Sequence, residues 1–284
     1  MRRSGDWVAG VFRPPWWEAL GATLLFALAA FAWVVWLGGL SVGWDTLNHH
    51  VYLGWMAVEG GRLNQDVFAA GSMSCQYPYA YGPLYWLQAH GATGVQAALV
   101  LALPAVGAAP AVWLIAWSLF PRRGGTAGLV RFAWAALAFL SPLWWSLLDS
   151  TSNDIASSLP MIWAFALVLW RGACDLEARE CYPGGAAVLQ GSGPWMAAAG
   201  AMVALALAVK ISQAFAALGV LVVAVATAPR WSTIGLRVLA FGAGGVAAAL
   251  LVWWPWAKQT WESCGSPIYP MLADQLRPWV GHLP

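Results

Sequence analysis

The chain has 284 residues, of which 61% are hydrophobic and only 9% charged, and its mean hydropathy is +0.64. Soluble globular domains normally carry about a quarter charged residues, so this composition excludes that class and indicates a polytopic membrane protein. The formal net charge is only +2, and the sequence has no basic stripe or base-reading motif. Nothing therefore suggests a nucleic-acid partner, and none is expected.

The first apolar run covers residues 19–40 and follows a short basic start with Arg2 and Arg3. It lacks a small-residue cleavage site at its end, so we expect an uncleaved span that leaves the N-terminus in the cytoplasm. Six further apolar runs follow, at residues 94–119, 132–148, 155–170, 195–209, 211–228 and 238–257. Helices are the only lipid-exposed option for such single segments, so the sequence predicts an all-α protein with about seven transmembrane helices.

Residues 195–228 are either one long helix with Lys210 inside it or a hairpin that turns at Lys210. One helix of that length would measure about 51 Å against a hydrocarbon core of about 30 Å, which favours the hairpin. With the hairpin, ten basic residues fall on the cytoplasmic side and four on the other, in agreement with the positive-inside rule. One long helix would give ten and three, so the length argument decides and the charges do not. The four outer ones are Arg62, Lys210, Lys258 and Arg277.

This topology gathers the ionisable groups on one outer face. It places there the segment 41–93, the turn at 149–154, the turn at Lys210 and the tail after Trp256. We therefore expect the long outer loop between the first two spans, residues 41–93, to carry interfacial helices and to hold the functional site.

Asp45 opens a helical-looking stretch, residues 46–59, in this loop. Two interpretations are open and do not exclude each other. The carboxylate is the N-cap of an interfacial helix, or it is a general base among aromatic walls. The tyrosines and tryptophans of residues 77–86 form either an interfacial aromatic belt or a platform for a sugar ring.

Lys210 and Asp154 are the other candidates. Lys210 between two apolar runs is either an anion site or a side chain that reaches the interface, and Asp154 is either part of a cap signature or a site residue. His49 and His50 point about 100° apart on a helix and cannot readily share one metal ion. A divalent cation held by Asp45, Asp66 or the histidines stays open, with no cofactor as the favoured interpretation.

The four cysteines divide between the two expected sides. Cys75 and Cys264 fall on the outer side and could form a disulfide if that side is oxidising. Cys174 and Cys181 fall on the cytoplasmic, reducing side.

Four segments together resemble the bacterial branch of the GT-C fold integral-membrane glycosyltransferases, which use polyprenyl-phosphate-linked sugars. The segments are GWDTLNHHVYLGWMAVEGGRLNQDV (43–67), SNDIASSLPMIWA (152–164), LALAVKIS (205–212) and CGSPIYPML (264–272). The similarity covers most of the chain, in the family's order, although His49 stands where the family has Tyr and Ser266 where it has Asn. Relatives run on through further spans, so the resemblance implies a short or truncated member with a single domain over 1–284.

The resemblance implies an inverting glycosyltransferase of the inner (plasma) membrane, active on the face outside the cytoplasm. Its partners are membrane lipid and a polyprenyl-phosphate-sugar donor. Asp45 matches the position of the general base, and Lys210 and Arg62 are expected at the donor phosphate. Substrate contacts are expected from His49, His50, Asp66, Gln76, Tyr77 and Asp154. The alternatives are a transporter or lipid- or sugar-binding membrane protein without catalysis, and an inactive fragment of such an enzyme.

Overall fold

The structure is a computed structural model that describes residues 14–61, 71–121, 124–181 and 192–269. Its secondary structure within these ranges is helical, with no strand. Five helical segments are long and apolar enough to cross a membrane. They are α2 (Trp16–Trp36), α5 (Gly94–Leu101) followed by α6 (Leu103–Leu119), α9 (Asp154–Cys181), α10 (Ser192–Val209), and α12 (Trp231–Ala248) continued through η6 (Ala249–Trp253) into α13 (Trp254–Cys264).

Large apolar side chains cover the outside of these helices. Leu28 on α2 is 69% exposed and Leu239 on α12 is 72% exposed. Surfaces of this kind are stable in lipid and prone to aggregate in water. The chain is therefore a membrane-embedded all-α protein.

Two further apolar helices are shorter: α7 (Gly125–Phe139), and α11 (Ala214–Ala226), which the single turn η5 (Ile211–Gln213) precedes. The expected continuous span over residues 132–148 is wrong, because α7 ends at Phe139 and a separate helix, α8 (Pro142–Leu147), begins at Pro142. Proline lacks a backbone N–H and disfavours a helical residue before it, and Ser141 is accordingly extended, at φ −61° and ψ 126°.

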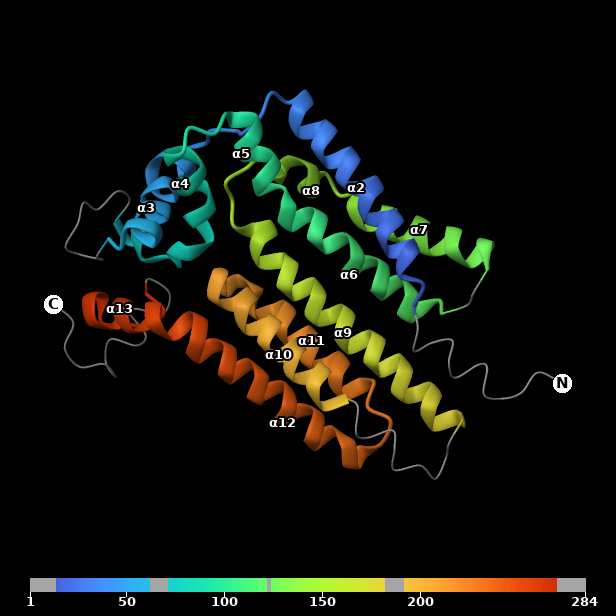
Figure 1. Cartoon of the computed structure of the whole chain (residues 1–284). Helices are drawn as coiled ribbons and strands as arrows, with labels where there is room; N and C mark the ends of the chain where they lie inside the picture. The colour runs from blue at the N-terminus through green and yellow to red at the C-terminus, as the bar shows by residue number, and fades with distance from the viewer. Residues whose placement is uncertain (1–13, 62–70, 122–123, 182–191, 270–284) are drawn as a thin grey trace.

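The turn expected at Lys210 is confirmed. Lys210 has an extended backbone, at φ −153° and ψ 110°, which separates α10 from η5. The carbonyl of Val209 accepts a hydrogen bond from Asn153 Nδ2, at the start of α9, at 3.1 Å. Thr227, just beyond α11, instead lies against Gly172, far along α9. Helices α10 and α11 therefore run in opposite directions, and one long helix is excluded (Figure 1).

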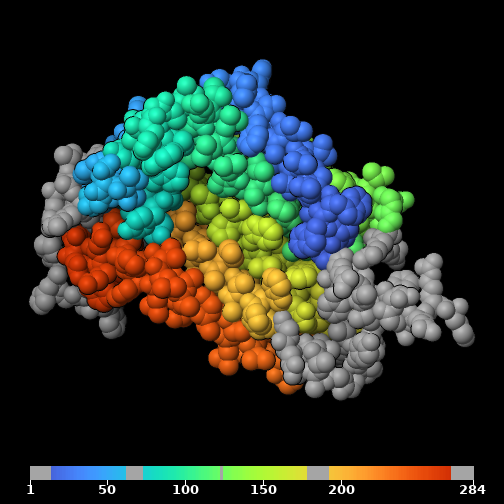
Figure 2. All heavy atoms as spheres, in the orientation of Figure 1, coloured from blue at the N-terminus to red at the C-terminus, as the bar shows by residue number. Residues whose placement is uncertain are grey.

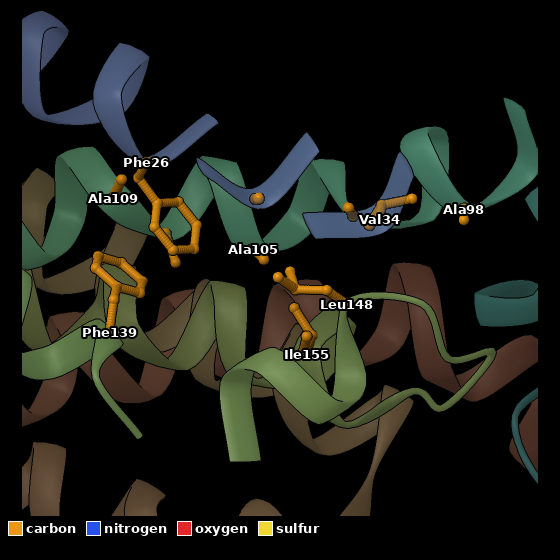
Figure 3. Packing of buried hydrophobic residues seen from close by; sticks show 11 residues of the cluster. Phe26, Val34, Ala98, Ala105, Ala109, Phe139, Leu148 and Ile155 are labelled. Atoms are coloured by element: carbon orange, nitrogen blue, oxygen red, sulfur yellow. The ribbon is translucent and has the colours of Figure 1, made fainter. Parts of the chain in front are cut away.

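Helix α9 runs through the middle of the bundle, with α2 and α6 on one side and α10 to α12 on the other (Figure 1). On the first side, Phe26 of α2 stacks on Phe139 of α7 with ring centroids 4.0 Å apart, beside small residues of α6 such as Ala105 (Figure 3). On the other side, α9 packs on Met196 of α10 and Val220 of α11. The first of these cores includes Ile155, so it fixes the first turn of α9, which carries Asp154.

Glycines bring α10 and α12 into backbone contact. A Cβ added to Gly200 would lie 1.9 Å from the carbonyl oxygen of Phe241, and one added to Gly244 would lie 1.9 Å from that of Ala197. Only glycine fits at such a distance. The Gly- and Ala-rich run 242–250 therefore serves close helix packing, as its composition indicates.

Two arginines are buried in ion pairs inside the bundle. Arg131 of α7 binds Glu18 of α2 through two hydrogen bonds, of 2.8 and 2.7 Å. Arg237 of α12 pairs with Asp175 of α9, which Arg171 also contacts, at 2.6 Å. Arg131 and Arg237 are two of the ten basic residues that the sequence assigned to the cytoplasmic side. Both are buried within helices, where the carboxylates of Glu18 and Asp175 neutralise them.

Residues 41–93, which the sequence predicted to be a long loop with interfacial helices, contain short helices that cover the end of the bundle where α9 begins. These cap helices are η1 (Thr46–His50), α3 (Val51–Glu59), η2 (Gly71–Cys75), η3 (Pro78–Tyr81) and α4 (Gly82–Ala89). The helix expected over residues 46–59 is present as η1 and α3. Leu53, Met56 and Tyr81 pack with Trp256 of α13 in one buried cluster, and Figure 2 shows the blue and teal atoms of the cap helices lying against the red atoms near the end of the described chain.

Candidate functional site

Three separate segments meet where α9 begins. They are η1, the residues 149–154 that precede α9, and the Lys210 turn between α10 and α11. Their side chains form a polar cluster made of Asp45, Thr46, His49, His50, Thr151, Asp154 and Lys210. The sequence predicted this convergence of segments, and the contacts described below bear it out.

Thr151 joins η1 to the segment before α9. Its Oγ1 lies 2.7 Å from Thr46 Oγ1 and 2.7 Å from His50 Nδ1, and all three side chains are buried. η1 is a π-helical turn, closed by a hydrogen bond from the Val51 N–H to the Thr46 carbonyl. Such wide turns occur mostly as single turns and often at functional sites. The turn brings Thr46 and His50 to the same threonine.

His50 is held as a neutral imidazole. Its ring stacks on Tyr81 with centroids 4.4 Å apart. Burial lowers the pKa of His50 to about 4, with further lowering by His49 and Lys210, against a raising effect from Asp45. At neutral pH His50 therefore acts as a hydrogen-bonding group and not as a cation.

His49 lies next to Asp45 and is buried, with 1% of its surface exposed. Its Nδ1 has no hydrogen-bond partner among the described residues, and the nearest carboxylate oxygen, Asp45 Oδ1, is 3.9 Å away. Burial lowers the pKa of His49, although the Asp45 charge opposes this. A small movement of the carboxylate would bring the two groups into hydrogen-bond range.

The Asp45 carboxylate is 59% exposed at the outer edge of the cluster. Asp45 has helical backbone angles, φ −62° and ψ −37°, and its side chain makes no capping hydrogen bond to η1. The sequence left Asp45 as an N-cap or as a general base, and no hydrogen bond supports the N-cap. The carboxylate is available to a ligand.

Lys210 and Asp154 form an ion pair that the sequence did not predict. Lys210 Nζ lies 2.5 Å from Asp154 Oδ1, and the second carboxylate oxygen accepts a 2.5 Å hydrogen bond from Ser152 Oγ. Ser152 Oγ also accepts the Asp154 N–H at 3.3 Å, so the expected cap at the start of α9 is made by serine. Both charged side chains are partly exposed, at 33% and 44%, and so remain open to a ligand.

Gln76 and Tyr77 bond to their neighbours and, within the described residues, make no hydrogen bond to the cluster. Tyr81, which stacks on His50, donates to Gln76 Oε1 at 3.2 Å. Tyr77 turns away and donates to the carbonyl of Val252 in η6 at 3.3 Å, and burial raises its pKa to about 12. Gln76 is thus connected to His50 through Tyr81, whereas Tyr77 supports the contact with η6.

Arg62 and Asp66 lie outside the described residues, so their expected roles carry no structural account. Within the described residues, no group of three His, Cys, Asp or Glu side chains is placed to hold a metal ion. The residues that sequence reasoning missed are Thr46 and Thr151, whereas Tyr81 belongs to the aromatic residues 77–86 that were expected as a belt or a platform. Only Thr151 had a signal, since it belongs to the polar run 149–154 that precedes an apolar helix.

The cluster combines an exposed carboxylate, a partly exposed ammonium group and neutral hydrogen-bonding groups next to an aromatic ring. Such a set can accept a proton, bind an anionic group and hold hydroxyls. Comparison of the chain with protein-family models, curated proteins and solved structures finds no match. Function is therefore inferred from the residues and their contacts.

Proposed function

We propose that this protein is an integral-membrane glycosyltransferase of the GT-C type. It moves a sugar from a polyprenyl-phosphate donor to an acceptor hydroxyl, with inversion at the anomeric carbon. In this proposal all seven apolar segments cross the inner membrane, and the cap helices form the outer loop. The polar cluster then faces the side outside the cytoplasm.

The observation that carries the proposal is the Asp45 carboxylate, which is exposed at the cluster and committed to no cap. A sugar acceptor must lose its hydroxyl proton as its oxygen attacks the anomeric carbon. Asp45 takes that proton while the bond from the anomeric carbon to the phosphate oxygen breaks, and polyprenyl phosphate leaves. A single displacement of this kind inverts the anomeric centre without a covalent intermediate.

The donor phosphate is placed at Lys210. The ammonium group has three N–H donors, and its contact with Asp154 uses one of them, so two remain for phosphate oxygens. Asp154 holds the ammonium group in place and also competes with the phosphate for it. Arg62 is proposed as a second cation at the phosphate.

The neutral groups of the cluster are placed for the sugar. His50 and Thr151 are fixed by their mutual hydrogen bond and stay uncharged at neutral pH, so they suit hydroxyl groups better than phosphate. Tyr81 supports His50 by stacking, and Gln76 holds the Tyr81 hydroxyl. His49 is proposed to orient the Asp45 carboxylate.

The proposal is tested with purified protein in lipid nanodiscs. Radiolabelled polyprenyl-phosphate hexoses and pentoses are offered with an envelope fraction of the source organism as acceptor. We expect transfer of label and release of polyprenyl phosphate. Asp45→Asn should lower the rate by about 10²- to 10⁴-fold, the usual cost of losing a general base.

The matched control is Asp149→Asn, a carboxylate of the turn before α9. It should fold and transfer sugar as the unsubstituted protein does. Because Asp45 makes no capping bond, Asp45→Asn should also keep its melting temperature. Saturable donor binding without transfer would favour a binding protein or transporter, and near-normal transfer by Asp45→Asn would refute the assigned base.

A further inference from the structure

Two cysteines from distant parts of the chain meet beside the cap helices. Cys75 ends η2 and Cys264 ends α13, 189 positions later. Their sulfur atoms are 3.4 Å apart, within hydrogen-bonding distance for thiols. A contact between residues so far apart in sequence depends on the fold alone.

The surroundings hold both backbones in place. Trp256 of α13 donates its indole N–H to the carbonyl of Cys75 at 3.3 Å, so η2 is bound to the helix that carries Cys264. Cys75 is buried, at 3% exposure, in the cluster that contains Leu53 and Tyr81. Cys264 lies at the edge of the same cluster and is half-buried.

We propose that Cys75 and Cys264 form a disulfide bond that joins the cap helices to the end of α13. A disulfide has an S–S distance of about 2.05 Å, so the two sulfurs must approach by about 1.4 Å. Rotation of the two side chains can supply a movement of this size, because the backbones are already held together. The bond would close a loop that includes most of the chain.

The order of the chemistry follows from exposure. A thiol oxidoreductase of the outer compartment that carries a disulfide can reach Cys264. The Cys264 thiolate attacks this disulfide, forms a mixed disulfide and releases one thiolate of the oxidoreductase. Cys75 then loses its proton and attacks Cys264 Sγ. The Cys75–Cys264 bond forms and the second thiolate of the oxidoreductase leaves. The two protein thiols lose two electrons and two protons, and the oxidant is reduced to a dithiol.

The hydrogen bond to Cys264 and burial both raise the pKa of Cys75. Cys75 is therefore a poor first nucleophile, which agrees with the initial attack by Cys264. The bond also bears on the polar cluster, since Tyr81 packs beside Cys75 and stacks on His50. Closing it should make the wall behind His50 more rigid.

The direct test is peptide mapping of protein isolated from membranes without reductant. The protein is denatured in a thiol-blocking reagent, digested and analysed by mass spectrometry. We expect a linked peptide pair containing Cys75 and Cys264 that separates after reduction, while Cys174 carries the blocking group. Blocking groups on both Cys75 and Cys264 in the unreduced sample would overturn the proposal.

A second measurement follows the melting temperature. Reductant should lower it by roughly 5–10 °C in the unsubstituted protein and in the control Cys174→Ser. In Cys75→Ser and in Cys264→Ser the melting temperature should already be low and should not respond to reductant. An equal melting temperature of the unsubstituted protein with and without reductant would count against the bond.

Discussion

At the scale of single residues, the loss of Lys210 should weaken donor binding, whereas the loss of the Asp154 carboxylate should not. Lys210→Ala removes the ammonium group and should weaken binding of polyprenyl phosphate by about 1.5–3 kcal/mol, or roughly 10- to 150-fold. Asp154→Asn removes the competing carboxylate and should leave binding equal or tighter. Tryptophan fluorescence reports the dissociation constants, because the chain has 22 Trp residues.

The control for this pair is Lys258→Ala. Lys258 is an exposed lysine of α13 that faces Glu262 at 3.7 Å, so its loss should leave donor binding unchanged. Both Lys210→Ala and Asp154→Asn should fold, because partly exposed ion pairs contribute little to stability. If Asp154→Asn weakened binding as much as Lys210→Ala, the pair would act as one structural unit and the competition would not exist.

His50 should make the folded protein sensitive to acid. Its pKa is about 4 in the folded protein, against the ordinary value of 6.5 in the unfolded chain, so between these values the unfolded chain binds a proton that the folded protein excludes. The contribution is fully present above pH 6.5 and is lost as pH falls towards 4, at a cost of up to about 3 kcal/mol. His49, Asp45 and Lys210 are the charged or titratable groups that act on it.

The measurement is the melting temperature between pH 7 and pH 4. In His50→Gln the amide can still bond to Thr151 but does not titrate, so the fall with acid should be shallower than in the unsubstituted protein. His90→Gln, at the exposed end of α4, should keep the full slope. Equal slopes in the unsubstituted protein and His50→Gln would show that other groups cause the acid sensitivity.

Charge explains which cluster residues the sequence could predict. Asp45, Asp154 and Lys210 stand out because ionisable groups are rare in this chain. Thr46 and Thr151 are uncharged, and their hydrogen bond joins positions 105 apart that only the packed bundle brings together. The pairing of Lys210 with Asp154, 56 positions away, could not be predicted either, because the sequence around each residue does not indicate its partner.

At the scale of helices, Gly244 should be the most sensitive position of α12. A Cβ there would lie 1.9 Å from the carbonyl oxygen of Ala197 in α10, so Gly244→Val must push the two helices apart. We expect a loss of at least about 3 kcal/mol or failure to fold, because overpacking at backbone contacts cannot relax by side-chain rotation. Thermal unfolding in detergent measures the effect.

The matched control is Gly242→Val, two residues away on the same helix. An added Cβ at Gly242 meets nothing within 4 Å, so this change should alter stability by less than about 1 kcal/mol. Equal destabilisation by the two variants would mean that helix propensity matters here and contact with α10 does not.

The sequence predicted some of the helix boundaries correctly and missed others. The break at Lys210 was predicted correctly because one helix would be far longer than a bilayer is thick. The break at Pro142 was missed because the apolar run continues through it, and hydropathy does not register the lost N–H. The last segment also exceeds its prediction of 238–257, since its helices continue from Trp231 to Cys264.

At the scale of the whole molecule, the arrangement of the segments was predictable and their pairing was not. Alternating spans must return to the same face, so counting apolar runs was enough to place η1, the turn before α9 and the Lys210 turn together. Which side chains then touch depends on how the helices pack against one another. That packing rests on residues such as Gly200 and Phe26, whose partners lie far away in sequence.

The proposed topology requires the two ends of the bundle to lie on opposite sides of the membrane. Ser212, in η5 beside Lys210, and Ser232, at the start of α12, are both exposed and lie at opposite ends of α11. With a membrane-impermeant maleimide, Ser212→Cys should be labelled in intact cells and Ser232→Cys only after permeabilisation. Label on the unsubstituted chain is subtracted as background. The reverse pattern would place Lys210 and the polar cluster in the cytoplasm, and a donor presented on the outer face could then not reach Asp45.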